Sequence, residues 1–175
     1  MIKVHRVPCL SDMYSYVLEG ADGAVVVVDP GEAAPLIAFL EERALKPDML
    51  LITHHHWDHM DGAQDMLDWH LCPVIGADPD GSRPDSPAKT RVRVDFERVL
   101  HEGDNFTFGG ETVHILETPG HTPEHLCFYF EHSGFVLAGD ALFSLGCGRI
   151  LDGSINQLWA SLQKLKALPD DTRLY

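Results

Sequence analysis

Thr53-His54-His55-His56-Trp57-Asp58-His59 places four histidines and an aspartate directly after the apolar run 49–52. That run predicts a buried strand, so the cluster begins where a rigid element ends. In an extended segment His54 and His56 point the same way and can bind one metal ion. A turn after them could aim Asp58 and His59 at a second ion. Imidazole nitrogen and carboxylate oxygen suit divalent zinc, iron or manganese, so the stretch predicts a metal site.

Two later segments could complete this site. Thr118-Pro119-Gly120-His121-Thr122-Pro123-Glu124-His125 is a sharp turn after the predicted strand 111–117, and it could deliver one more histidine. We prefer His121 as that ligand, because His125 sits at the start of the next strand. Asp140 ends the apolar run 137–139. An isolated aspartate there is usually a helix cap or a turn residue, but beside a histidine loop it is expected to bridge two metal ions.

Length and composition bound the class of protein. The chain has 175 residues, of which 45% are hydrophobic, which suits one domain spanning residues 1–175. The net charge of −14 opposes nucleic-acid binding. No apolar run approaches the roughly 20 residues that span a bilayer, and no signal peptide is visible, so we expect a cytoplasmic protein without membrane contact. The four cysteines form no C-x-x-C pair and are expected to be reduced, with Cys147 apart from the core and the others inside it: Cys9, Cys72 and Cys127.

The remaining pattern predicts short strands and a few helices. A capping box of Ser154 and Gln157 predicts the start of the last helix. Each half of the chain has strands, then an apolar strand that ends in aspartate, then a helix, which predicts two facing sheets with helices outside. The expected strands are 2–7, 14–19, 24–28, 49–53, 74–76, 98–101, 105–108, 111–117, 126–131, 134–138 and 172–175. The expected helices are 34–45, 61–69 and 155–168, with an exposed loop over 78–89. The last helix should bury Ile155, Leu158, Trp159, Leu162 and Leu165.

At this point the sequence resembles the metallo-β-lactamase fold superfamily, and within it the glyoxalase II (hydroxyacylglutathione hydrolase) family. The histidine loop, the turn 118–122 and Gly139-Asp140 carry the wider resemblance. Gly146-Cys147-Gly148-Arg149 is more specific to glyoxalase II, and the opening segment 7–16 is also similar. The resemblance runs over essentially the whole chain.

The resemblance implies an α/β fold, an αββα sandwich, with a site for two divalent ions (zinc, with iron or manganese as alternatives). Carried over by motif, one ion would be held by His54, His56 and His121, the other by Asp58 and His59, and Asp140 would bridge them. Arg149 would contact an anionic glutathione thioester. Asp29 is expected to orient a ligand histidine, with a plain turn role as the alternative. The family uses the cysteine equivalent to Cys147 structurally.

The sequence also departs from the family. Its last metal ligand, in a Cys-Gly-His-Glu-Tyr-Thr segment, and its C-terminal helical domain are absent, so we expect a fragment that lacks both. Met13 stands where the family usually has Asn, and Asp61 where it usually has Gly. Asp61 is expected either to cap the following helix or to support the ligand loop. Leu151 stands where some members have an aromatic residue. These three changes bear on substrate geometry.

The implied reaction is thioester hydrolysis, as in S-lactoylglutathione, to give glutathione and a hydroxy acid. Metal ions lower the pKa of bound water from about 15.7 toward neutrality, which makes hydroxide available. Asp58 could orient that water or take its proton. The alternatives are an iron-dependent persulfide dioxygenase of the same fold and a fragment without activity. The oligomeric state is left open.

Overall fold

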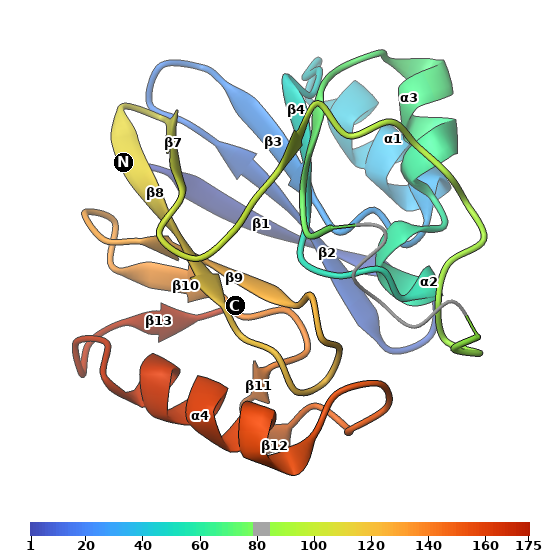
Figure 1. Cartoon of the computed structure of the whole chain (residues 1–175). Helices are drawn as coiled ribbons and strands as arrows, with labels where there is room; N and C mark the ends of the chain where they lie inside the picture. Colours follow the sequence, from blue (N-terminus) through green and yellow to red (C-terminus); the bar gives the residue numbers. More distant parts are fainter. Residues whose placement is uncertain (79–84) are drawn as a thin grey trace.

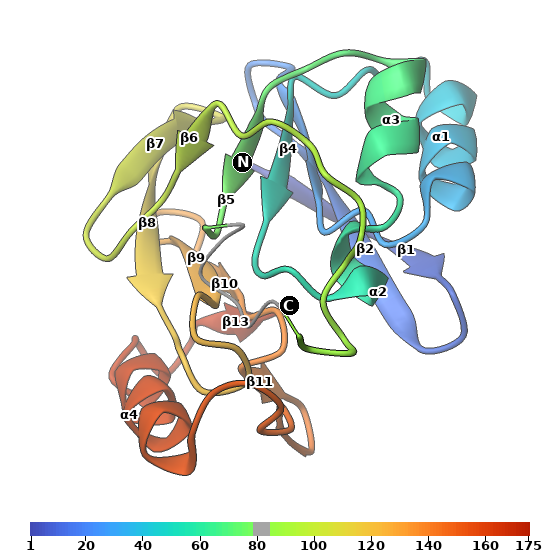
Figure 2. The same cartoon turned by 45° about the vertical axis from the view of Figure 1, so that its right-hand side comes forward.

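Two sheets packed face to face form the centre of the computed structural model, which describes residues 1–78 and 85–175. The first sheet has the order β1-β2-β3-β4-β5-β6 and the second β13-β10-β9-β8-β7. Figures 1 and 2 show α1 and α3 outside one sheet and α4 outside the other. This is the predicted αββα sandwich. No helix among the described residues is long and apolar enough to cross a membrane.

The first sheet combines an antiparallel edge with a parallel centre. β1, β2 and β3 are antiparallel, whereas β3 to β6 run parallel. Parallel strands covered on both faces favour continuous β-branched and aliphatic runs, and all four valines of β3 are buried. The strand and helix bounds on this side are β1 (Lys3–Cys9), β2 (Met13–Glu19), β3 (Val25–Val28), α1 (Ala33–Glu42), β4 (Met49–Ile52), α2 (Trp57–Met60), α3 (Ala63–Trp69), β5 (Val74–Gly76) and β6 (Arg98–Val99).

The second sheet is antiparallel apart from the pairing of β10 with β13. A separate two-stranded hairpin, β11 with β12, follows β10 and was not predicted. The bounds are β7 (Asn105–Phe108), β8 (Glu111–Glu117), β9 (Leu126–Phe130), β10 (Phe135–Leu137), β11 (Leu142–Phe143), β12 (Gly146–Cys147), α4 (Ile155–Lys166) and β13 (Arg173–Leu174).

Three apolar clusters hold these layers together. The first lies between the sheets and includes Leu51, Phe128 and Phe130. A second packs α1 and α3 on the first sheet, and a third packs α4 on the second. All four cysteines are free, and Cys9 and Cys127 are buried as predicted. The prediction for Cys72 was wrong, because it is only partly buried at the edge of the α1–α3 cluster.

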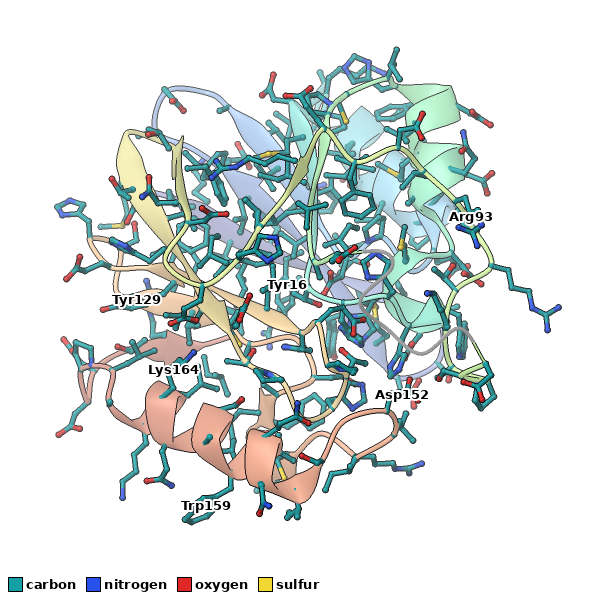
Figure 3. The ribbon with its side chains drawn as sticks, in the orientation of Figure 1. Tyr16, Arg93, Tyr129, Asp152, Trp159 and Lys164 are labelled. Atoms are coloured by element: carbon teal, nitrogen blue, oxygen red, sulfur yellow. The ribbon has the colours of Figure 1, made fainter. Side chains whose placement is uncertain are left out.

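Several local predictions were also wrong. Ile155 and Trp159 are both 64% exposed, whereas Leu158 and Leu165 are buried as predicted and Ser161 is buried beside them. Figure 3 shows Trp159 pointing away from the sheets. The helix expected over 61–69 begins later, as α3, and is preceded by the unpredicted short helix α2; Asp61 ends α2 rather than capping α3. The loop expected over 78–89 includes residues 79–84, which lie outside the described residues.

Candidate metal centre

The predicted site residues lie at one end of the sandwich, where strands of both sheets finish. Asp29 follows β3 and the histidine loop follows β4 in the first sheet. His121 and Asp140 follow β8 and β10, which run in the same direction because each is antiparallel to β9. The loops meet directly, since the Leu126 N–H donates to the Thr53 carbonyl at 2.9 Å. Strand direction therefore brings distant segments to one place.

Five side chains form two overlapping groups with the spacing of metal ligands. In each group the ligand atoms all lie within 4.8 Å of one another. His121 Nε2 lies 2.8 Å from His56 Nδ1 and 3.3 Å from Asp140 Oδ2. His59 Nε2 lies 3.2 Å from Asp140 Oδ1. The groups are His54, His56 and His121, and His54, His59 and Asp140.

In three of the four histidines the ring nitrogen that faces away from this centre has a hydrogen-bond partner. Thr53 Oγ1 donates to Asp29 Oδ2 at 2.7 Å, so it accepts from His54 Nδ1 at 2.9 Å. His59 Nδ1 lies 3.0 Å from the same Asp29 oxygen, and His121 Nδ1 lies 2.6 Å from the Arg149 carbonyl. A proton on each outer nitrogen leaves the inner nitrogen with its lone pair, which is the form that binds metals.

The ionisable groups at the centre carry different charges. Burial and the neighbouring imidazoles lower the pKa of His54 well below its ordinary value, so this ring is neutral. Burial would also lower the pKa of His59, but hydrogen bonds to the Asp140 and Asp29 carboxylates outweigh it and raise that pKa well above its ordinary value. Burial would raise the pKa of Asp140, yet His59 and His121 hold it at about 2. The neutral ring of His54 and the ionised carboxylate of Asp140 are suitable ligands, whereas His59 carries a proton that a metal ion would displace.

Asp58 and Arg149 lie farther out. Asp58 is in the first turn of α2, partly exposed, with Oδ2 at 3.9 Å from His59 Nε2, so it belongs to neither group of close ligand atoms. Both residues line a cleft of about 900 Å³ beside the centre. Met13, Leu151 and the exposed Cys147 line the same cleft.

Two glycines allow the backbone to approach the centre closely. A Cβ on Gly148 would lie 1.9 Å from the Asp140 carbonyl oxygen, which is far inside van der Waals contact. Gly139 has a φ of +47°, and a Cβ there would lie 2.7 Å from His125 Nε2. These contacts give a physical reason for the glycines of the 139–140 and 146–149 motifs.

The prediction did not include two residues that support the centre. Asp152 lies in the loop before α4 (Figure 3), where its side chain is 5% exposed and Oδ2 is 3.7 Å from His56 Nε2. His125 accepts from the Asp140 N–H at 3.0 Å and contacts Thr118 Oγ1 at 2.8 Å, so its ring nitrogens are engaged. The sequence had suggested His125 only as the less favoured alternative to His121 as a metal ligand. Nothing in the sequence around Asp152 distinguishes it from a turn residue.

The model of one protein family matches almost the whole chain. It describes the metallo-beta-lactamase superfamily and covers residues 13–175. The chain belongs to this superfamily. Among solved structures, the BLEG-1 B3 metallo-beta-lactamase is similar with a TM-score of 0.83 and 29% identity, over 99% of this chain and 90% of that one. TTHA1623 in a di-iron-bound form has a TM-score of 0.80 and 28% identity, over 97% and 89% of the two chains.

Curated relatives carry a more specific name within the metallo-beta-lactamase superfamily. A protein of Ruegeria pomeroyi named hydroxyacylglutathione hydrolase is 41% identical over 172 residues, which are 98% of this chain. Another of that name, from Rhodopseudomonas palustris, is 40% identical over 174 residues. The chain spans 64% of the length of each of these relatives.

Proposed function

We propose that this chain binds two divalent metal ions at the centre and hydrolyses thioesters, with hydroxyacyl thioesters of glutathione as its substrate class. The convergence of inner imidazole nitrogens on Asp140 is the observation that carries the proposal. The similarity to proteins named hydroxyacylglutathione hydrolase supports the substrate class. One ion would be held by His54, His56 and His121. The other would be held by Asp58 and His59, with Asp140 between the two ions.

The donor set fits such ions on its own chemistry. His54 Nε2 is buried and has no hydrogen-bond partner among the described residues, although burying an unpaired polar atom is costly. His121 Nε2 faces both His56 Nδ1 and Asp140 Oδ2. A divalent ion would satisfy these acceptors together. Nitrogen and carboxylate ligands suit zinc, iron and manganese, so the donors alone leave the choice of metal to experiment.

The bound ions would supply a nucleophile at neutral pH and positive charge for the developing oxyanion. The remaining tasks fall to side chains in the cleft. Asp58 is placed to orient water or accept its proton. Arg149 and Arg6 line the cleft and provide positive charge for a substrate carboxylate. A thiolate leaving group, with a parent pKa of about 8.5, needs no strong general acid.

The test measures metal content and two reactions on the same preparation. We expect about two ions per chain and release of glutathione from S-lactoylglutathione. His121→Gln should abolish turnover, whereas His114→Gln on the surface of β8 should leave it unchanged. Oxygen consumption with glutathione persulfide, without thioester cleavage, would favour the dioxygenase alternative. One tightly held ion and no turnover of either substrate would contradict a hydrolase.

A further inference from the structure

Beside the metal centre lies a buried pair of ionisable residues that the proposed reaction does not use. His55 stands between His54 and His56 in the loop after β4. Glu124 stands between His121 and His125 in the turn after β8. The side chain of His55 is 1% exposed and that of Glu124 is 3% exposed. Each loop that carries proposed ligands therefore contributes one member of the pair.

The two residues contact each other across the junction of the sheets. The His55 N–H donates to Glu124 Oε1 at 3.3 Å, and His55 Nδ1 lies 3.7 Å from the same oxygen. The His55 ring faces Phe96, with ring centroids 5.5 Å apart. Glu124 Oε2 and both His55 ring nitrogens are buried without a hydrogen bond in the described part of the chain. Burying a carboxylate is costly, so the presence of Glu124 at this buried position requires a compensating interaction.

We propose that His55 and Glu124 are positioning residues that clamp the two ligand loops at the spacing a metal ion needs. The inference rests on the metal site proposed above. The loops leave different sheets, and strand pairing within one sheet does not fix their separation. The Glu124 carboxylate holds the backbone N–H of the residue between two proposed ligands. The Leu126 N–H to Thr53 carbonyl bond holds the same two loops on the other side.

The experiment compares Zn²⁺ affinity with the stability of the metal-free protein. The dissociation constant is measured in competition with a chromophoric chelator, and stability by urea unfolding in EDTA. Glu124→Ala should weaken Zn²⁺ binding about 10- to 100-fold, the usual range for partners that hold ligands in place. Glu124→Gln keeps the size and one acceptor and should lose about tenfold, at the low end of that range. Glu111→Gln is the matched control, because Glu111 joins two segments through Ser133 away from the centre.

A purely structural role would give a different result. In that case Glu124→Ala would lower the stability of the metal-free protein but leave Zn²⁺ affinity and the visible spectrum of the Co²⁺-loaded protein unchanged, which would overturn the clamp. If Glu124→Ala does not fold, unchanged Zn²⁺ affinity in Glu124→Gln overturns it. A double-mutant cycle with His55→Gln should show coupling, and additive losses would contradict the pair. A wild-type chain that binds neither Zn²⁺ nor Co²⁺ would instead refute the proposed metal site.

Discussion

At the residue scale, the proposed histidine ligands differ in the groups that lie against their outer ring nitrogens. A hydroxyl holds His54, a carboxylate holds His59 and a backbone carbonyl holds His121. The partner of His56 is the buried carboxylate of Asp152. His54 and His59 therefore share one support, because Thr53 is itself hydrogen-bonded to Asp29, whereas His56 and His121 both depend on the loop 149–152.

Asp152→Asn tests the support of His56. The substitution keeps the shape of the side chain but removes the negative charge that favours a proton on the outer nitrogen of His56. We expect Zn²⁺ affinity to fall about tenfold, measured by chelator competition, while the fold remains intact. Asp170→Asn, an exposed change after α4, is the control. Equal affinity of Asp152→Asn and wild type would show that Asp152 does not act on the centre.

His125 should make the metal-free protein sensitive to acid. Burial and the nearby His121 lower the pKa of His125 to about 3, whereas an unfolded histidine titrates near 6.5. Between these values the unfolded state binds the extra proton, so stability falls as pH falls, by about 1.4 kcal/mol per pH unit for one proton. Urea unfolding of His125→Gln in EDTA should show lower stability near neutrality and a smaller loss in acid. An unchanged pH slope would contradict this account.

At the element scale, α4 supports the turn that carries His121. Ser161 is buried, and its hydroxyl donates to the Pro119 carbonyl at 2.7 Å. Gly120 has a φ of +141°, and a Cβ there would lie 2.4 Å from the backbone of Leu158. Helix and turn therefore pack too closely for either to move alone.

Ser161→Ala tests this support. The change leaves the Pro119 carbonyl without its donor, which costs about 1–3 kcal/mol for a buried group. Urea unfolding should show that loss, and Zn²⁺ affinity should fall as the His121 turn loosens. Ser11→Ala, in the exposed turn between β1 and β2, should change neither quantity. Stability lost without any change in affinity would mean that α4 does not position the turn.

The hairpin β11–β12 offers a comparison between two neighbouring glycines. Gly148→Ala should displace the backbone of Asp140, because the new methyl group would overlap its carbonyl oxygen. Gly146→Ala should be tolerated, since nothing lies within 4 Å of the position of its Cβ. Metal analysis after dialysis should find less metal in Gly148→Ala than in wild type, and equal metal in Gly146→Ala. Equal occupancy in both variants would contradict a tight approach at Gly148.

Elements whose apolar pattern is local could be predicted from the sequence, and contacts between distant segments could not. The β-branched run of β3 and the helix α4 were correctly predicted in position. The buried face of α4 was predicted only in part: Leu158 and Leu165 are buried, but Ser161 also faces inward, where it donates to a carbonyl of another segment. The site shows the same division. The spacing of the histidines predicted a role for His54 and His56. Asp152 and Glu124 come close to the centre only through the packing of the two sheets, which the sequence does not show. The assignment of ligands itself stays a prediction.

At the scale of the whole molecule, the centre joins the two sheets. Three of the five converging side chains follow β4, and two follow strands of the second sheet. An ion held by all of them would link both halves of the sandwich. It would bind the folded state and not the unfolded one, and so stabilise the fold by mass action.

Thermal unfolding with and without zinc tests this linkage. At a Zn²⁺ concentration of 100 times the dissociation constant the stabilisation is about 2.7 kcal/mol, which corresponds to a Tm increase of about 5–11 °C for a chain of this size. His121→Gln should show a much smaller increase. Mg²⁺, which prefers oxygen ligands, should have little effect on the wild type. An equal increase with both ions would indicate binding to surface carboxylates instead.

The three tryptophans of the chain lie in three different helices. Trp69 ends α3, where its Nε1–H donates to Glu41 Oε1 at 3.2 Å, and Trp159 lies on the outer face of α4. Trp57 begins α2 at the cleft and is 46% exposed. Variants that keep a single indole would therefore report by fluorescence on one helix each. The emission of Trp57 should respond to ligands in the cleft, while the other two would record whether the outer helices detach together or in turn.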